Sequence, residues 1–197
     1  PIKSDSSNIY LAGHTQKDQW DVLLMKYNLD GDLLWSKTWR GSSTANVNEN
    51  IYGMVVDNSS NIYIAGSNIG TYSYDDGSKG VSDVIIQKYD PNGNLLWSKV
   101  GGTDKWEDVG GGGLAVSTSG IYVAGTIGYP REINQTEGFD VLVQKYDLSG
   151  NLIWSKTWGN QGYDDGAASL AADNTGVYIT GFTGATGGAE TGGDLLV

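Results

Sequence analysis

The sequence predicts an all-β fold, a β-propeller built from four-stranded antiparallel blades. Three observations predict it: the same phrases recur along the chain, tight-turn sequences separate them, and 30 glycines accompany 12 tyrosines and seven tryptophans in 197 residues. Glycine supplies turns, and aromatic residues favour strands. The chain has no cysteine, which excludes disulfides, thiolate metal sites and cysteine nucleophiles.

Each repeat contains four strand-length segments, which we term A to D in chain order. Segment B is NIYLAG or a close variant, in copies that begin at Asn8, Asn61, Gly120 and Gly176. Segment C is DVLLMKY or a close variant, in copies that begin at Asp21, Asp83, Asp140 and, cut to DLLV, Asp194. Segment D is LLWSK or LIWSK, with its tryptophan at Trp35, Trp97 and Trp154. A looser apolar segment A precedes B.

Short turn sequences join A to B and C to D, among them DNSSN, DNTG, DPNGN and DLSGN. Gly and Asn tolerate a positive φ, so these sequences predict tight hairpin turns. Strands joined by such turns run antiparallel, and each repeat is therefore expected to be a four-stranded meander. Segment C is almost continuously apolar, which predicts a strand covered on both faces, as in a blade between two neighbours.

The recurring side chains have predicted structural roles. Trp35, Trp97 and Trp154 are expected to fill the gap to the adjacent blade. Asp21, Asp83 and Asp140, at the start of segment C, are expected to accept backbone N–H groups where the chain re-enters the blade. Lys26, Lys88 and Lys145 are expected to pair with acidic groups between blades.

These phrases resemble a known repeat. Ile/Val-Tyr-x-Ala/Thr-Gly, followed by Asp-Val-x-x-x-Lys-Tyr and then Gly-Asn-Leu-Leu/Ile-Trp-Ser-Lys, is similar to the SBBP repeat, the seven-bladed β-propeller repeat, over nearly the whole chain. The resemblance implies a propeller of about seven blades. It also implies occurrence in secreted or cell-surface proteins of bacteria and archaea, and it supplies no catalytic residue.

The repeat divides the chain into one partial propeller of four blades, at about 1–40, 47–101, 108–159 and 164–197. The first blade lacks part of segment A, and the last lacks segment D. We therefore expect the sequence to belong to a longer chain that continues into further blades or domains. The alternative is a closed ring of four blades, at the lower end of the range for propellers.

The charge and hydropathy exclude several partner classes. A net charge of −11 and a pI of about 4.3 disfavour nucleic acids and anionic membrane surfaces, which are bound mainly by Lys and Arg. No apolar run approaches transmembrane length. The single histidine, His14, excludes a multi-histidine metal site within this chain.

The B–C and D–A connections vary between repeats, and variation on one face of a fixed scaffold is typical of a binding surface. The aromatic candidates for ligand contact are Trp20, Tyr72, Tyr74, Trp106, Tyr129 and Tyr163. The leading interpretation needs no cofactor, and the carboxylates suited to bind Ca²⁺ are Asp75, Asp76, Asp164 and Asp165. The glycosylation acceptor triplets begin at Asn58 and Asn134.

The predicted function is that of a non-enzymatic module at the cell surface or outside the cell, either structural or binding other surface proteins or glycans. Three alternatives remain open. KYDxxGNLLW is distantly similar to a phrase of quinoprotein-type propeller enzymes, which bind pyrroloquinoline quinone and Ca²⁺, although that family has Ala-Leu where this chain has Lys-Tyr. The others are a calcium-dependent carbohydrate-active protein and an intracellular assembly scaffold.

Overall fold

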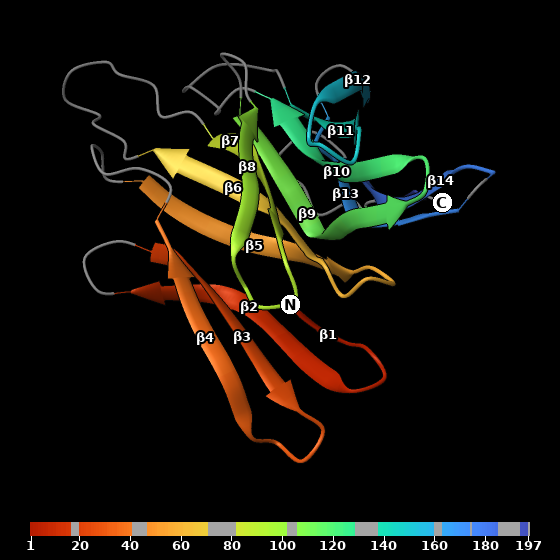
Figure 1. Ribbon diagram of the computed structural model, residues 1–197. Helices are drawn as coiled ribbons and strands as arrows, with labels where there is room; N and C mark the ends of the chain where they lie inside the picture. Colours follow the sequence, from red (N-terminus) through yellow and green to blue (C-terminus); the bar gives the residue numbers. More distant parts are fainter. Residues whose placement is uncertain are drawn as a thin grey trace.

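The structure is a computed structural model that describes residues 1–16, 20–40, 47–70, 82–101, 106–128, 138–159, 163–173, 175–184 and 194–196. Its described residues form strands and no helix, in three four-stranded sheets and one three-stranded sheet (Figure 1). Within each sheet, every strand pairs antiparallel with its neighbour in chain order. The prediction of an all-β chain built from repeated antiparallel sheets is confirmed. No described helix is long and apolar enough to cross a membrane.

The strands follow the order of the repeat. Sheet 1 contains β1 (Ile2–Ser4), β2 (Asn8–Gln16), β3 (Trp20–Asn28) and β4 (Leu33–Trp39). Sheet 2 contains β5 (Val47–Val56), β6 (Ile62–Gly70), β7 (Ser82–Tyr89) and β8 (Leu95–Gly101). Sheet 3 contains β9 (Trp106–Ser117), β10 (Gly120–Gly128), β11 (Phe139–Tyr146) and β12 (Leu152–Trp158). Sheet 4 contains β13 (Asp165–Ala172), β14 (Val177–Thr183) and β15 (Asp194–Leu196).

Consecutive sheets pack against one another, and their first strands lie together. β9 contacts β5 on one side and β13 on the other, and β1 contacts β5 (Figure 1). The last strands of the four-stranded sheets, β4, β8 and β12, are mostly exposed. Each complete sheet therefore has a first strand beside those of its neighbours and a last strand toward solvent.

A separate hydrophobic core fills each junction between sheets. Tyr10 and Leu24 of sheet 1 pack with Ile64 and Ile85 of sheet 2. Equivalent clusters join sheet 2 to sheet 3 and sheet 3 to sheet 4. Burial of each such aliphatic side chain contributes about 2 kcal/mol, so these junctions rather than the single sheets stabilise the fold.

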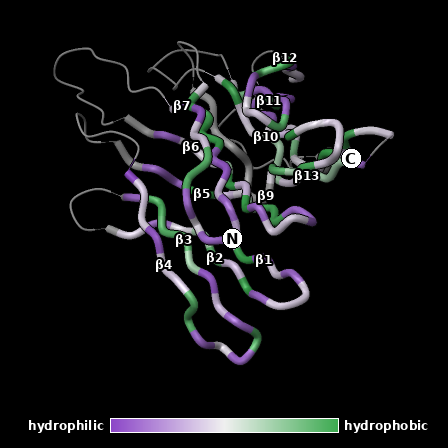
Figure 2. Tube along the Cα trace, viewed as in Figure 1, coloured by the Kyte–Doolittle hydropathy of each residue, from purple (hydrophilic) through white to green (hydrophobic). Residues whose placement is uncertain are grey.

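Strand β7 shows why segment C is apolar on both faces. Ile85 and Tyr89 face sheet 1, whereas Val84 and Ile86 face sheet 3. All four side chains are at most 2% exposed. Hydrophobic residues also run along the equivalent strand β3 (Figure 2). A middle sheet therefore needs apolar residues at successive positions, and the alternation of a one-sided sheet disappears.

A glycine of segment B faces a β-bulge in segment A. In sheet 2, Ile51 pairs with Gly66 and Gly53 pairs with Ala65, which leaves Tyr52 as the extra residue of β5. A Cβ atom on Gly66 would overlap the carbonyl oxygen of Asn50. Gly181 faces the equivalent irregularity of β13 and would overlap the carbonyl of Gly166 in the same way. The recurring Ala/Thr-Gly of the repeat therefore admits a close approach of two backbones.

Asx turns close the hairpins at one end of the sheets. Between β7 and β8, Oδ1 of Asp90 accepts the backbone N–H groups of Asn92 and Asn94 at 2.8 and 2.9 Å. The carboxylates of Asp5, Asp57, Asp147 and Asp173 each accept two N–H groups in the same way. In the turn after β3, Asn28 takes this position, and its Oδ1 accepts the N–H of Asp32 at 2.8 Å.

These hydrogen bonds shift the titration of the turn carboxylates. The backbone N–H of Asn94 and then its side chain lower the pKa of Asp90, and Asn151 lowers the pKa of Asp147 likewise. For Asp5, burial alone would raise the pKa, but hydrogen bonds from several neighbours together lower it to about 2. A pKa below its value in the unfolded chain means that the ionised carboxylate stabilises the fold.

We expect the free energy of unfolding to fall as the pH drops from about 4, the ordinary carboxyl pKa, toward the lowered pKa values of the folded state. The stabilisation from these carboxylates is fully present above their pKa in the unfolded chain, and it is lost below their pKa in the folded protein. Replacing both Asp90 and Asp147 by asparagine should flatten this dependence, because asparagine can accept the same bonds, as Asn28 does, but does not titrate. Urea unfolding between pH 2 and pH 6 measures the slope.

The matched control is Asp30→Asn, which removes an exposed carboxylate from the turn in which Asn28 already accepts the hydrogen bond. Its slope should remain closer to that of the parent than the slope of the double variant does. An unchanged slope in the double variant would show that the two turns contribute no acid sensitivity.

Candidate functional site

The two ends of each sheet differ in chemistry. We call one end the turn end, because short turns close the hairpins there. These turns are Asp5–Asn8, Asn28–Asp32, Asp57–Asn61, Asp90–Asn94, Ser117–Gly120, Asp147–Asn151 and Asp173–Gly176. We call the other end the loop end. There the strands lead into residues 17–19, 41–46, 71–81, 102–105, 129–138, 159–164 and 184–193. Because neighbouring strands are antiparallel, both the B–C and the D–A connections leave each sheet at its loop end.

Three of the six predicted aromatic ligand-binding residues lie at the loop end of the described structure. Trp20 begins β3 opposite Gln16, and Trp106 begins β9 opposite Gly128. Tyr163 precedes β13, and its side chain is 41% exposed. The remaining aromatic candidates, Tyr72, Tyr74 and Tyr129, lie outside the described residues. So do the metal candidates Asp75 and Asp76 and the glycosylation candidate Asn134, whereas Asn58 is exposed in the turn after β5.

The other two metal candidates have separate surroundings. Oδ1 of Asp164 accepts the backbone N–H of Phe139 at 3.1 Å, which ties the start of sheet 4 to β11. Asp165 begins β13, and none of its surface is exposed. Among the described residues, no three His, Asp or Glu side chains are grouped so that they could hold a metal ion.

The recurring aspartates at the start of segment C differ in their surroundings. Both carboxylate oxygens of Asp21 accept hydrogen bonds from Arg40, from Nε at 2.8 Å and from Nη2 at 3.1 Å. Burial raises the pKa of Asp83. The carboxylate of Asp140 lies against Gly159, the residue that corresponds to Arg40. In sheet 1, Asp21 is therefore linked to the residue that follows segment D through the side chain of Arg40.

Sequence reasoning did not find the buried acid Glu49, and it named Asp165 only as a candidate for Ca²⁺. Glu49 of β5 is 1% exposed and pairs with Asn68, two residues after Gly66. Asp165 of β13 occupies the equivalent position, because it pairs with Thr183, two residues after Gly181. In sheet 3, Glu107 of β9 occupies this position opposite Ile127. Burial, and then the charge of Glu49, raise the pKa of Tyr89. Aligning the copies of segment A across the bulge, with the segment B glycine as the reference point, would have shown that an acidic residue recurs at this position.

A contact that we call the clasp joins the C–D turns of sheets 2 and 3 to the preceding sheet. A Cβ atom on Gly93 would come within 2.9 Å of the Trp35 ring and 3.1 Å of Cγ of Lys37. A Cβ atom on Gly150 would likewise come within 3.0 Å of the Trp97 ring and 2.9 Å of Cγ of Lys99. Both glycines have a positive φ. The Trp-Ser-Lys of sheet 1 and that of sheet 2 therefore each hold the C–D turn of the next sheet, which explains why the tryptophan and the lysine recur together.

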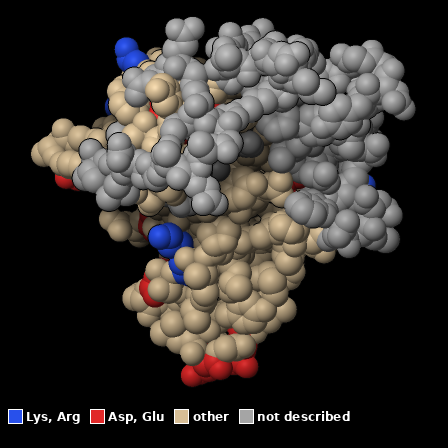
Figure 3. Space-filling view, turned by 180° about the vertical axis from the view of Figure 1, so that it is seen from behind, with Lys and Arg blue, Asp and Glu red and all other residues tan. Residues whose placement is uncertain are grey.

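Charge supports the clasp. Besides hydrogen bonds from Asn94, the charge of Lys37 lowers the pKa of Asp90 in the next sheet, and Lys99 acts likewise on Asp147. At the free tip of sheet 1, the turn with Asp30 and Asp32 forms an acidic point (Figure 3). A Cβ atom on Gly31 in that turn would meet no atom within 4 Å.

The lysines of segment C contact aromatic rings. Nζ of Lys88 lies 4.9 Å from the centre of the Tyr63 ring, directly across the ladder between β7 and β6. Lys26 over Tyr10 and Lys145 over Tyr122 repeat the arrangement at 5.2 and 5.1 Å. Lys26 also donates a hydrogen bond to the carbonyl of Pro91 in the next sheet, at 3.4 Å. The observed partners are thus tyrosines and a carbonyl, where acidic groups were expected.

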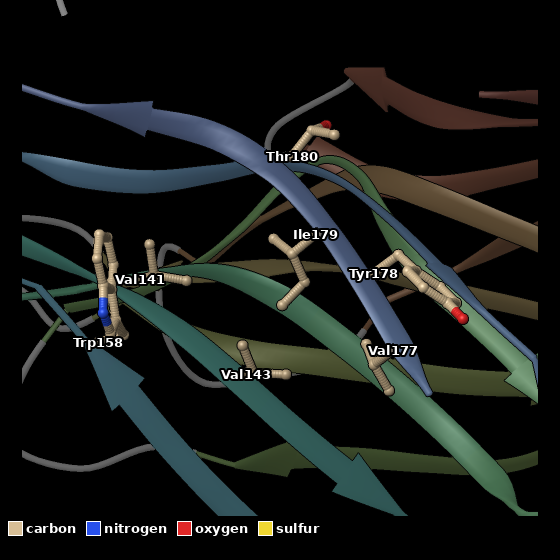
Figure 4. Close-up of a pocket in the computed structure, with 7 residues that line it drawn as sticks. All are labelled: Val141, Val143, Trp158, Val177, Tyr178, Ile179 and Thr180. Carbon is tan, nitrogen blue, oxygen red and sulfur yellow. The ribbon is translucent and has the colours of Figure 1, made fainter. Parts of the chain in front are cut away.

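An apolar groove lies between sheet 3 and β14. Its volume is about 450 Å³ and its lining comes from β11, β12 and β14: Val141, Val143, Trp158, Val177, Tyr178, Ile179 and Thr180 (Figure 4). Val177 and Ile179 point from β14 toward β11, whereas Tyr178 points to the other side of its strand. The groove is thus an apolar gap between sheets rather than a pocket with converging polar groups.

The chain was compared with known proteins. No protein-family model and no curated protein matches it.

Proposed function

We propose that this chain is part of a non-enzymatic β-propeller of the SBBP type, which binds proteins or glycans through its loop end as part of a secreted or cell-surface protein. The observation that carries the proposal is the contrast between the two ends. At the turn end, the repeated polar side chains hold the turns and the clasps. At the loop end, the sequence changes from one sheet to the next.

The repeated junction supports a propeller. Each sheet packs on the next through the same strands, its first strand lies beside the neighbouring first strand, and the same Trp-Ser-Lys clasps the next turn. A junction that repeats with one geometry turns each unit by a similar step. Such a step, continued through enough units, closes a ring around the first strands.

The chemistry of the loop end supports binding. Tyr163 is exposed there, and the sequence adds Tyr72, Tyr74 and Tyr129 together with several carboxylates. Aromatic faces stack on sugar rings, and carboxylates accept hydrogen bonds from sugar hydroxyls. Tyrosine also suits protein interfaces because it offers a large contact area at a low entropic cost.

A glycan array, probed with labelled protein in calcium and in EDTA, tests the glycan arm, and titration calorimetry quantifies each hit. Changing Tyr72, Tyr74 and Tyr163 together to alanine should weaken binding at least about tenfold, the usual loss for central aromatic contacts. The control is Leu29→Ala, which removes a 61% exposed side chain at the turn end and should bind like the parent.

Photocrosslinking tests the protein arm. A benzoylphenylalanine at position 163 should capture surface partners on intact cells, and the same probe at position 29 should not. The proposal would be contradicted by equal capture at both positions together with unchanged glycan binding by the triple variant. A quinone chromophore in the absorption spectrum of the purified protein would favour an enzyme instead.

A further inference from the structure

One of the A–B turns at the turn end lacks the aspartate that the others carry. Asp5, Asp57 and Asp173 open the turns of sheets 1, 2 and 4, whereas Ser117 opens the turn of sheet 3. The turns of the two neighbouring sheets lie on either side of it, and the turn Ser117–Gly120 itself carries no charged residue. The difference is therefore set by one residue in the middle of the chain.

Sheet 1 shows what this aspartate does. Oδ1 of Asp5 accepts the backbone N–H groups of Ser7 and Asn8, both at 2.8 Å. Oδ2 accepts the hydroxyl of Tyr10 at 2.8 Å, and Lys26 covers the ring of that tyrosine. Hydrogen bonds from a phenol and from two N–H groups thus hold one carboxylate at the turn end of sheet 1.

In sheet 3, hydroxyl groups stand where that carboxylate would be. Oγ of Ser117 accepts the backbone N–H of Ser119 at 3.2 Å, and the two Oγ atoms lie 2.8 Å apart. Oγ of Ser119 lies 2.8 Å from the hydroxyl of Tyr122, and Nζ of Lys145 lies 5.1 Å from the centre of the Tyr122 ring. Tyr122 is 6% exposed, whereas Ser119 is open to solvent. We call Ser117, Ser119 and Tyr122, together with Lys145, the hydroxyl cluster.

The hydroxyl cluster has a donor to spare and no negative charge of its own. Its three hydroxyl groups carry three protons, and the two contacts between them use two of these. Within the described part of the chain, no acceptor takes the third proton. The ammonium group of Lys145 adds further donors and a positive charge.

The titration of two equivalent tyrosines follows the same contrast. Burial, and then Asp5, raise the pKa of Tyr10 to about 12. Hydrogen bonding by Ser119, and then by Lys145, lowers the pKa of Tyr122. A negative charge is already supplied beside Tyr10, and one is favoured beside Tyr122.

We propose that the hydroxyl cluster binds a carboxylate group of another molecule, in the place that the Asp5 carboxylate has in sheet 1. One carboxylate oxygen accepts the spare hydroxyl proton, and the negative charge lies near the ammonium of Lys145. Because the equivalent position holds an aspartate in the other sheets, a planar carboxylate matches it better than a tetrahedral oxyanion does. The site is at the turn end, so the inference does not depend on ligand binding at the loop end.

Ser117→Asp tests the inference within the protein, because it restores the carboxylate that the other turns have. The variant should melt about 2–4 °C above the parent, the shift expected in a chain of this size when existing donors gain a charged acceptor. Ser117→Asn, which offers an oxygen of similar reach without the charge, should gain less. The difference between the two melting temperatures measures the effect of the negative charge.

Acetate is the probe for a carboxylate from outside. In amide NMR spectra at constant ionic strength, acetate should shift the N–H signals of Ser119 and Gly120 along a saturable curve, whereas chloride should not. Ser117→Asp should show no such curve, because its own carboxylate fills the place. General effects of salt on the protein surface act on both proteins and cancel in the comparison.

A matched pair of serine variants locates the site. Ser119→Ala removes the hydroxyl that links Ser117 to Tyr122, and it should weaken acetate binding at least about tenfold, the usual loss of a hydrogen bond to a charged group. The control, Ser149→Ala, removes an exposed hydroxyl from the C–D turn of the same sheet, where Asp147 already accepts the N–H of residue 149 at 2.9 Å. It should bind acetate like the parent.

Two larger probes distinguish the sources of the carboxylate. Glucuronate represents an acidic sugar, and the α-amide of N-acetylglutamate represents an acidic side chain of a peptide. Both should compete with acetate, and the tighter of the two identifies the class of partner. The triple alanine variant at Tyr72, Tyr74 and Tyr163 should bind acetate like the parent, so failure of the loop-end function and failure of this inference are distinguishable.

Three results would overturn the proposal. Acetate and chloride could shift the same N–H signals equally, Ser117→Asp could respond to acetate as the parent does, or inorganic phosphate could bind more tightly than acetate. The first two would show that the hydroxyl cluster recognises no carboxylate, and the third would assign it to tetrahedral oxyanions instead.

Discussion

Replacing Gly66 with alanine is expected to destabilise the protein by about 3 kcal/mol, the upper range for forcing extra atoms into a packed site. The new methyl group would overlap the carbonyl oxygen of Asn50, in the bulged segment of β5. The obstacle is backbone held in a ladder, so rotation of a side chain cannot remove it. Chemical denaturation, with the midpoint and slope compared with the parent, measures the loss.

Gly13→Ala is the matched control. Gly13 is the same residue of the repeat, but β1 pairs only with Ile9 to Leu11, and a Cβ atom on Gly13 would meet nothing within 4 Å. Its stability should stay within about 0.5 kcal/mol of the parent, and alanine should restrict the unfolded chain slightly. Equal destabilisation by the two substitutions would mean that the bulge contact is not the reason for glycine.

The arrangement of the strands could be predicted because its signals are local. A continuous apolar run such as Val84–Ile86 needs cover on both faces, and the structure supplies it from sheets 1 and 3. The Asp-x-x-Gly-Asn turns are equally local, since one carboxylate accepts the N–H groups of its own turn. Repetition then supplied several independent readings of each segment.

Contacts between repeats could be predicted only in part. The recurrence of Trp97 indicates a wedge between sheets, but sequence alone does not show that the wedge seats Gly150 of the next turn. Glycine is needed at position 150 both for its positive φ and for the close contact with the indole. Because the turn alone explains the glycine, its sequence gives no sign of the contact. The lysines were harder to interpret. Their charge suggested acidic partners, whereas the ladder places Lys88 directly across from Tyr63.

The candidate site at the loop end was the least predictable part. Its aromatic and acidic residues follow no period that fixes their direction, so the sequence could nominate Tyr163 and Asp164 but not their surroundings. Asp164 holds the backbone of Phe139 in the neighbouring sheet. The burial of Glu49 and Asp165 could not be predicted, because the bulge shifts both residues out of simple alternation.

Replacing Trp97 with alanine is the second large effect we expect, a loss of about 3 kcal/mol, at the low end for tryptophan because the side chain is only partly buried. The indole packs on the core between sheets 2 and 3, lies 6.4 Å from the Tyr63 ring and holds Gly150. Trp154→Ala removes an equivalent indole, 6.4 Å from the Tyr122 ring. It should cost about 1 kcal/mol less, because no described turn is seated on it. Thermal and urea unfolding of the two variants measure the difference.

A double-mutant cycle isolates the clasp from the loss of the indole. Gly150→Ala should destabilise through its positive φ and through contact with Trp97, whereas Gly31→Ala has a similar positive φ and open space around it. The extra cost of Gly150→Ala over Gly31→Ala should therefore disappear once Trp97 is alanine, a coupling of about 1 kcal/mol. Additive effects of Trp97→Ala and Gly150→Ala would mean that the two residues do not hold each other. The recurrence of tryptophan would then reflect packing within a sheet alone, and the proposed propeller would lose its main support.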